Sequence, residues 1–528
     1  MTDYKAIVND TKLYTLFKSI LVGLLAGIMV VFYRSVLIWA EDISFELFGY
    51  VKNNLQVIPV AIVVLIGIGL LIGTLIYKFR MISGSGIPQV KGIIMGHFND
   101  SWLSTLLAKF FGGAVSILAG FSLGREGPSI QLGGCVGEGV GNKFANSRTE
   151  KKILIVSGAS AGLAAAFNAP LAGAVFALEE IIKYVSPVIL LSTMVSAVVA
   201  DFISTMVFGL SPVFDFVVNS VIPQNGYWLL FILGAVLGAA GAFYNYVLLK
   251  VQKLYKKAKW LNVYTRPVIP AIAALTISFF FPLVLGSGNR IITELHPSNG
   301  IAVLCLILLF KFIFSIISFG SGAPGGIFFP LLVMGATIGA IFGKIAITYL
   351  GFDPSLFFNF VIIAMAGFFT AIVRAPITGI ILLVEMTGSF AGLLSLTAVS
   401  IVAYVTATLF KSAPIYESLL GNLIKENNPA GVEYDGDKKV TMEVVVQHGS
   451  LAANKLVKEV DLPKSCLLIA IKREGRDIIP RGDTKISAGD NLVLMTDLSC
   501  EVLTRAALTK IATCVSYGPS GPSGGRFR

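Results

Sequence analysis

Charged side chains are scarce in this chain. Asp, Glu, Lys and Arg together make up 13% of its 528 residues, whereas soluble domains carry about 25%. Apolar residues reach 55%, and the mean hydropathy is +0.81. A water-soluble globule of this length needs more polar surface than the composition supplies. The composition therefore predicts a multi-spanning integral membrane protein embedded in a lipid bilayer.

Histidine and cysteine are also rare, with three and five residues. The histidines are scattered and form no nucleophile–base grouping, so catalysis is a poor interpretation and we expect no enzyme. The cysteines show no paired or metal-ligand spacing, and we interpret them as reduced thiols that pack, with no metal site and no cofactor. These residues are His97, His296 and His448, and Cys135, Cys305, Cys466, Cys500 and Cys514.

The net charge of +11 comes from short basic clusters between apolar runs, for example within residues 143–152 and 250–259. Basic clusters beside membrane spans are typical of cytoplasmic loops, so we expect no nucleic acid as a partner. No cleavable signal peptide is apparent, because the first apolar run, about residues 17–39, is long enough to span the membrane and to be retained as a helix.

Apolar segments alternate with brief polar interruptions from about residue 17 to residue 420. Some are long, such as 57–77 and 227–249, and others are short and broken by Gly and Pro, such as 127–140 and 325–339. Broken helices at membrane depth are tolerated only where their ends face protein or a watery cavity. This pattern favours a transporter or channel over a simple anchor.

An internal repeat runs through this region. Ala-Pro at 169–170, then Gly173 and Glu179, recurs at identical spacing as Ala-Pro at 375–376, Gly379 and Glu385. Gly133 and Gly137 recur as Gly335 and Gly339. Such features are also common in ordinary helix packing in membranes. Duplicated halves with broken helices in matching places predict a central binding site, and the number of spans per half, which decides whether the halves are inverted, stays open at this point.

Three glycine-rich segments each end in a proline near the start of an apolar helix: 84–88 (GSGIP), 124–128 (GREGP) and 322–330 (GAPGGIFFP). Glycine exposes backbone N–H groups, and a helix N-terminus attracts anions through its free donors and its partial positive charge. Several such ends at one point could bind an anion without Lys or Arg. The alternative is that Gly and Pro merely permit close packing.

Taken together with Ala-Phe-Asn-Ala-Pro at 166–170 and Pro-Ile-Tyr at 414–416, the three segments resemble the signatures of the CLC family of chloride channels and transporters. The resemblance covers about residues 15–425 in the family's order and spacing. It implies an all-α polytopic membrane domain with the CLC fold of two inverted repeats and broken helices. It also implies a homodimer with one anion pathway in each subunit.

The resemblance assigns roles residue by residue. The anion-binding set is implied to be the hydroxyls of Ser85 and Tyr416, the backbone N–H groups of Ile327 and Phe328, and Gly127. Glu126 matches the gating glutamate, and Glu180 matches the internal glutamate that relays protons in exchangers.

Simple chemistry supports a gating role for Glu126 independently. A carboxylate at a helix N-terminus mimics a bound anion, and protonation frees it to swing away. Two unit charges about 4 Å apart repel by about 4 kcal/mol at an effective dielectric of 20. This repulsion is enough to prevent the carboxylate and an anion from occupying the site together. The alternative is a helix cap paired with Arg125.

Glu180 carries the weaker assignment. An ionisable residue in or near a span is a functional hypothesis by default. Lys183 lies three residues further on, so a plain i,i+3 ion pair is the alternative. Glu385 is the repeat counterpart within the Glu179 pattern, and we assign it no transport role.

Glu126 and Glu180 together favour proton-coupled chloride exchange, because channel members of the family lack the internal carboxylate. A passive chloride channel is the alternative, and a fluoride/proton exporter is a less favoured one because that branch departs from the intact GSGIP segment. Nitrate-selective relatives carry Pro where this chain has Ser85. We therefore expect chloride as the transported ion, exchanged for protons.

After residue 425 the pattern changes to a linker (426–439) and a small α/β domain (440–512). Strands are predicted at 443–447, 466–472 and 491–496, and helices at 451–457 and 499–508. The domain resembles the TrkA-C (RCK C-terminal) module, with 475–483 its most distinctive stretch. This implies a cytoplasmic regulatory domain that binds a nucleotide such as cyclic di-AMP, or else a passive dimer-stabilising appendage. Eukaryotic family members carry a different domain here, so we expect a bacterial inner membrane; residues 513–528 are interpreted as a disordered tail or an expression scar.

Overall fold

The computed structural model describes residues 2–214, 216, 221–258, 260–390, 392–427, 439–463, 466–473, 476–497, 504, 507–508 and 510–512. The chain divides into two compact units, Met1–Ile424 and Lys425–Arg528. Each unit is described by itself.

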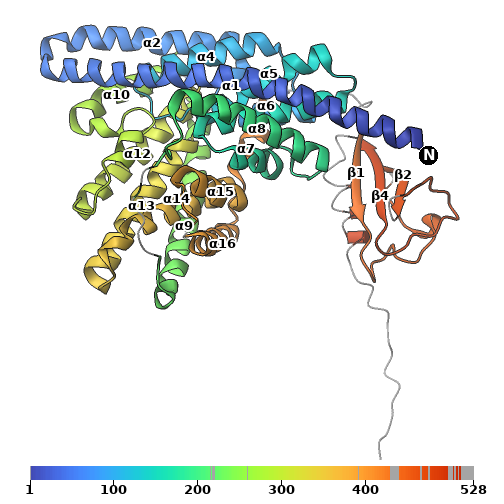
Figure 1. Ribbon diagram of the computed structural model, residues 1–528. Helices are drawn as coiled ribbons and strands as arrows, with labels where there is room; N and C mark the ends of the chain where they lie inside the picture. The colour runs from blue at the N-terminus through green and yellow to red at the C-terminus, as the bar shows by residue number, and fades with distance from the viewer. Residues whose placement is uncertain are drawn as a thin grey trace, which may run out of the picture. The chain divides into compact units, whose positions relative to one another are not determined.

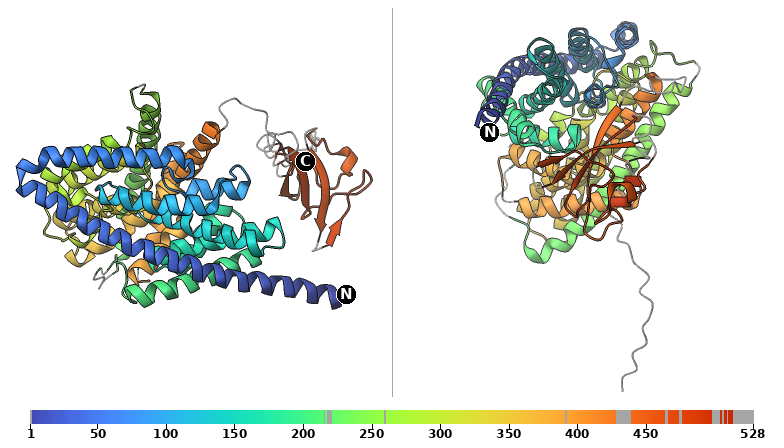
Figure 2. Two further views of the ribbon diagram at one scale, coloured as in Figure 1. Left: turned by 90° about the horizontal axis from the view of Figure 1, so that it is seen from above. Right: turned by 90° about the vertical axis from the view of Figure 1, so that its right-hand side faces the viewer.

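The first unit is helical (Figure 1). Its helices are α1 (Thr2–Asn53), α2 (Ile58–Lys78), α3 (Ile87–Met95), α4 (Trp102–Leu118), α5 (Glu126–Phe144), α6 (Arg148–Phe167), α7 (Pro170–Phe176), α8 (Pro187–Phe208), α9 (Tyr227–Lys257), α10 (Val268–Phe280), α11 (Asn289–Thr293), α12 (Ile301–Gly320), α13 (Phe328–Leu350), α14 (Phe357–Val373), α15 (Pro376–Thr387), α16 (Leu393–Leu409) and α17 (Ile415–Asn427). Helix α1 is one continuous rod, drawn in dark blue in Figure 2. Among the described residues, seven helices are long and apolar enough to cross a membrane.

Glycines allow pairs of helices to pack with their backbones in contact. A Cβ atom on Gly133 of α5 would lie 2.0 Å from the carbonyl oxygen of Gly158 on α6, and one on Gly158 would lie 2.1 Å from that of Gly133. In the second half, a Cβ on Gly339 of α13 would lie 2.4 Å from the carbonyl oxygen of Phe360 on α14. The repeated glycines therefore occupy equivalent helix pairs, α5–α6 and α13–α14, where backbones touch without side chains between them.

The two halves also cap each other's helices. The Glu179 carboxylate accepts hydrogen bonds from the backbone N–H groups of residues 377 and 378, at 3.1 and 2.7 Å, at the start of α15. Glu385, on α15, accepts from those of residues 171 and 172, at 3.0 and 2.8 Å, at the start of α7. Both carboxylates satisfy N–H groups that a helix leaves unpaired. Two halves related by a twofold axis produce such reciprocal caps, as expected for the CLC fold of two inverted repeats. Glu385 therefore has a structural role, as the cap of α7.

The second unit contains an antiparallel sheet with the order β1-β4-β2-β3. Its strands are β1 (Lys439–Val445), β2 (Cys466–Arg473), β3 (Arg476–Ile478) and β4 (Asn491–Asp497). Leu468 on β2 lies opposite Leu494 on β4, and a bulge follows between Leu468 and Ala470. One face of the sheet buries Met442, Ile471 and Leu494 in a small core, which is the polar-out, apolar-in pattern of an antiparallel sheet with one solvated face.

Three predicted strands are present, but β1 begins earlier than expected because it pairs with β4 from Lys439 onward. The predicted helix at 451–457 is wrong: the chain makes turns there, and only a short 3-10 turn, Val457–Glu459, follows. Asn454 adopts a left-handed backbone conformation with φ of 65°, which interrupts an α-helix. The predicted helix at 499–508, the linker and the tail lie largely or wholly outside the described residues.

An ion pair with the buried carboxylate of Asp490 fixes the turn before β4. Arg473 donates to both carboxylate oxygens of Asp490, at 2.8 and 2.7 Å, and the Ser487 N–H donates to the same group at 2.7 Å. Burial alone raises the pKa of Asp490, but these hydrogen bonds outweigh it and hold the pKa below its usual range. The carboxylate therefore stabilises the fold when it is ionised.

We expect Asp490→Asn to lower the free energy of unfolding of a 425–528 fragment by about 1.5–3 kcal/mol at pH 7, because hydrogen bonds to a charged group are lost. Since the folded-state pKa is depressed, this contribution is present above about pH 4 and is lost as the pH falls further. Urea unfolding at pH 7 and pH 3 measures both effects. The exposed Asp477→Asn is the matched control, with a change within about 0.5 kcal/mol; equal effects of the two substitutions at pH 7 would contradict the assignment.

Candidate functional site

The three glycine-rich segments meet in space through backbone hydrogen bonds. The Gly84 N–H donates to the carbonyl oxygen of Gly322 (3.2 Å), and the Gly325 N–H donates to that of Gly84 (3.1 Å). Gly124 and Gly326 exchange two hydrogen bonds, at 2.7 and 2.8 Å. Helices α3, α5 and α13 start directly after these contacts, so three helix N-termini, each with free N–H donors, come together.

Two hydroxyl groups lie at this meeting point. Ser85 and Tyr416 are 2% and 0% exposed, and their side chains come within interaction range of each other. Neither hydroxyl completes a hydrogen bond of ordinary geometry with any residue that the structure describes. Buried hydroxyls normally have partners, so this pair is a polar site suited to an acceptor such as an anion.

Gly127 closes one side of the site. A Cβ atom on Gly127 would lie only 2.4 Å from the Ser85 hydroxyl oxygen and 2.6 Å from the Ser85 carbonyl oxygen. The absence of a side chain at this position therefore lets the first turn of α5 approach the serine directly.

The start of α13 supplies both backbone donors and an apolar wall. Ile327 precedes the helix and Phe328 is its first residue, and both are fully buried. The Phe328 ring contacts those of Phe167, Phe176 and Phe369, with centroids 5.2, 6.2 and 4.7 Å apart. The sequence analysis did not identify this aromatic cluster, whose members come from four helices with no shared spacing.

Glu126 is the first residue of α5 and is fully buried. Its carboxylate lies near the backbone N–H groups of Glu126 itself and of Phe329, and so near the starts of both α5 and α13. A Cβ on Gly124 would lie 2.3 Å from one carboxylate oxygen. Arg125 is 3.9 Å away, at the limit of an ion pair, so the capping interpretation rests on a weak contact.

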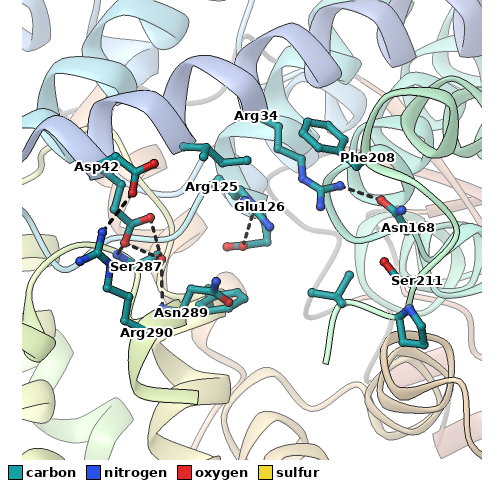
Figure 3. Close-up of a pocket in the computed structure, with 15 residues that line it drawn as sticks. Arg34, Asp42, Arg125, Glu126, Asn168, Phe208, Ser211, Ser287, Asn289 and Arg290 are labelled. Atoms are coloured by element: carbon teal, nitrogen blue, oxygen red, sulfur yellow. Dashed lines mark hydrogen bonds and ion pairs between the residues drawn. The ribbon is translucent and has the colours of Figure 1, made fainter. Parts of the chain in front are cut away.

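Glu126 faces a cavity of about 310 Å³ (Figure 3). Charged residues of both signs line it: Arg34, Arg125, Arg290, Glu41, Asp42 and Glu126. Arg34 donates to the Asn168 side-chain oxygen at 2.6 Å, and Arg290 pairs with Asp42 at 3.0 Å. The sequence analysis did not identify the lining residues from α1 and α11, because helices that lie far apart in the sequence bring them together: Arg290 and Asp42 are 248 residues apart.

A second copy of the Ser85 loop occurs 202 residues later, as Gly286-Ser287-Gly288. Gly84 and Gly86 have φ of 68° and 104°, and Gly286 and Gly288 have φ of 61° and 93°. The serines of the two copies differ in their partners. The N–H and hydroxyl of Ser287 donate to the Glu41 carboxylate at 3.0 and 2.9 Å, whereas the Ser85 hydroxyl does not bond to a carboxylate of any described residue. The repeated Gly-Ser-Gly triplet was a signal in the sequence that the analysis did not use.

A buried lysine supports each copy of the loop. Lys109 donates to the carbonyl oxygens of Ile82 and Gly84, at 2.9 and 2.6 Å. Lys311 donates to those of Val284 and Gly286, at 3.0 and 2.9 Å. Each ammonium group is therefore bonded to two backbone carbonyl oxygens at or just before the loop that it supports.

Glu180 lies in a π-helical turn, Ala177–Ile182, that follows α7. It pairs with Lys91 of α3 at 2.7 Å. The alternative pairing with Lys183 is wrong, because Lys183 bonds to Glu417 instead. The physical reason is local: Lys183 ends the turn in a left-handed conformation with φ of 60°, which turns its side chain away from the preceding residues.

The structure therefore brings Ser85, Gly127, Tyr416 and Glu126 to one place, with the start of α13 beside them. Glu180 lies apart, within electrostatic range of Tyr416. The roles of these residues stay predictions, but a buried site with helix N-termini, two hydroxyls and a carboxylate is suited to binding and releasing a small anion.

Comparison with known proteins agrees with this class of site. The chain matches the family model described as "voltage gated chloride channel" over residues 68–408 and the TrkA-C domain over residues 441–499. It is 32% identical over 430 residues to the H(+)/Cl(-) exchange transporter ClcA of Vibrio cholerae, covering 79% of this chain and 91% of the relative. It is 30% identical over 446 residues to that of Salmonella paratyphi A, covering 80% and 93%.

Solved structures show the same fold. The crystal structure of a slow cyanobacterial Cl⁻/H⁺ antiporter matches with a TM-score of 0.74 and 29% identity, over 78% of this chain and 99% of that one. A eukaryotic CLC transporter shares the fold at 21% identity and a TM-score of 0.66, over 78% and 74%. The chain is a multi-spanning membrane protein that belongs to the CLC family and carries a C-terminal TrkA-C domain.

We expect Gly127→Ala to weaken chloride binding by at least about tenfold, because the new methyl group displaces the Ser85 hydroxyl by its overlap at 2.4 Å; a lost charge-assisted hydrogen bond is worth about 1.5–3 kcal/mol. Isothermal titration of purified protein with chloride measures the change. Gly67→Ala on α2 is the control, since its added methyl group meets no atom within 4 Å. An unchanged affinity in Gly127→Ala would exclude Ser85 from the site.

Proposed function

We propose that this protein is a proton-coupled chloride antiporter, which exchanges chloride for protons across the membrane. The observation that carries the proposal is the fully buried Glu126 carboxylate at the starts of α5 and α13, beside the unpaired hydroxyls of Ser85 and Tyr416. The similar H(+)/Cl(-) exchange transporters, and the similar Cl⁻/H⁺ antiporter structure, support it.

The anion is held mainly by dipoles. The hydroxyls of Ser85 and Tyr416 and the backbone N–H groups of Ile327 and Phe328 donate to it, and Gly127 allows the close approach. A helix N-terminus carries about half a positive charge, so several of them hold an anion without a directly paired lysine or arginine. Such a site binds chloride and still releases it, which transport requires.

Glu126 couples the two ions. As a carboxylate it occupies the outer end of the anion pathway, where it competes with chloride by about 4 kcal/mol at 4 Å and an effective dielectric of 20. When it takes up a proton, it loses this charge and leaves, and chloride enters. Glu180 passes the proton to and from the other end of the route.

Two other functions make different predictions. A passive chloride channel moves chloride without protons and has no use for Glu180 as a proton carrier. A fluoride/proton exporter prefers fluoride to chloride, and the intact GSGIP segment at 84–88 argues against it.

We expect Glu126→Gln to abolish proton transport while chloride transport continues, because the amide cannot carry a proton and no longer blocks the pathway by its charge. Proton and chloride fluxes in liposomes with an imposed chloride gradient measure this. The wild type should drive protons uphill, and Glu180→Gln should also lose most of the proton flux.

The control is Glu46→Gln, an exposed glutamate on α1, which should leave both fluxes unchanged. Chloride flux without any proton flux in the wild type would show a channel and remove the proton roles of Glu126 and Glu180.

We further propose a homodimer in a bacterial inner membrane, with the TrkA-C domain in the cytoplasm as a regulatory module that binds a nucleotide such as cyclic di-AMP. The match of residues 441–499 supports a separate module of this type. Its compact sheet, with a core of its own, is suited to binding a ligand independently of the transport unit.

We expect cyclic di-AMP to change the rate of chloride transport by the full chain and to have no effect on a chain truncated after Asn427, because the truncation removes the module. Liposome flux with and without the nucleotide measures the response, with ATP as the control nucleotide. A full chain that ignores every nucleotide tested would indicate a passive appendage.

A further inference from the structure

Lys91 and Glu180 form the most deeply buried ion pair among the described residues. Their atoms are 2.7 Å apart, and the side chains are 1% and 2% exposed. Breaking such a pair on one side leaves an uncompensated charge in a poorly solvated place, which is strongly unfavourable. The ionisation of Glu180 and the charge of Lys91 are therefore linked.

Lys91 also belongs to the helix that begins at the anion site. It is the fifth residue of α3, whose N-terminus follows the Ser85–Gly86 loop. At 1.5 Å per residue, about 6–8 Å of helix separates its backbone from that N-terminus. A charge at this distance in a buried region acts on an anion beside Ser85.

Few other charges face Glu180. From its own turn comes Lys183, and from α17 come Glu417 and the phenol of Tyr416. Lys183 and Glu417 are bonded to each other and are 41% and 45% exposed, so water screens them. Helix α6 also packs against this turn, and its charged residues all lie in its first turns, at 148–152. Lys91 is thus the dominant and unscreened partner.

We propose that Lys91 is the electrostatic link between the proton site and the anion site. While Glu180 is ionised, Lys91 is neutralised by it and exerts little pull on the anion. When Glu180 takes up a proton, Lys91 is left as a bare buried cation, and the central site binds chloride more tightly. By reciprocity, bound chloride favours protonation of Glu180 by the same factor.

This inference rests on the proposed function, because it takes Glu180 as a proton site and the Ser85–Tyr416 site as the place of the anion. It adds a second coupling element, distinct from displacement by Glu126. A purely structural pair, which only fastens α3 to the π-helical turn, would stabilise the fold but would not transmit the charge state of Glu180 to chloride.

The test is a double-mutant cycle on chloride affinity, measured by isothermal titration of the full purified chain at one pH. All variants carry Glu126→Gln, so that the gate neither titrates nor competes. Glu180→Gln imitates the protonated state. We expect it to tighten chloride binding on the order of fivefold when Lys91 is present, and by less than twofold in Lys91→Met.

Two further variants keep the test informative. Lys91→Arg preserves the charge and should preserve the response to Glu180→Gln, which a loss of packing alone would not predict. Lys91→Gln replaces Lys91→Met if the latter does not fold, since an amide can still donate to the carboxylate. An equal response to Glu180→Gln with and without a cation at position 91 would overturn the link.

The pH dependence gives an independent readout. In the Glu126→Gln background, chloride affinity should rise as the pH falls from 8 to 5, and Lys91→Met should flatten this rise. Wild-type proton flux in liposomes separates the two proposals. Proton flux with no coupling in the cycle would contradict the link alone. Coupling without wild-type proton flux would contradict the proposed antiport and would leave only an electrostatic link between the charge at position 180 and the anion site.

Discussion

The backbone hydrogen bonds between Gly124 and Gly326 hold this structure's centre together. In a membrane every backbone donor must find a partner inside the protein, yet the starts of α5 and α13 are brought together with donors still free. Glycine makes this possible, because side chains at 124 or 127 would collide with Glu126 or Ser85. The close approach of two helix starts creates the proposed anion site, and the same free N–H donors suit the carboxylate of Glu126 to this place.

Two buried lysines stabilise the loops at the centre of the structure through their charges. Lys109 and Lys311 place their charges on carbonyl oxygens of the two Gly-Ser-Gly loops, so the charges are satisfied without touching the site. Direct contact between an ammonium group and chloride would bind the anion too strongly for transport. The cations instead stabilise the loops through their carbonyl oxygens.

Much of this could be predicted from the sequence, because it depends on local chemistry. The three Gly-Pro segments indicated helix starts, and the Glu179–Glu385 spacing revealed two halves. The pairing of Glu180 could not be predicted, since its partner Lys91 is 89 residues away and a left-handed turn at Lys183 removes the nearer lysine. The helix expected at 451–457 failed for a similar reason, a left-handed residue at Asn454 that composition does not reveal.

The function depends on where the two halves differ. Position 126 is Glu in the first half, and its counterpart 202 residues later is Phe328, which packs in an aromatic cluster. Ser85 keeps a free hydroxyl, whereas the hydroxyl of its counterpart Ser287 is bonded to Glu41. A symmetric frame alone would build two equivalent sites with no direction between them. A carboxylate from α1 binds Ser287 but not Ser85, so among the described residues the two loops are not equivalent, and the proposed anion site and its glutamate belong to the Ser85 loop alone.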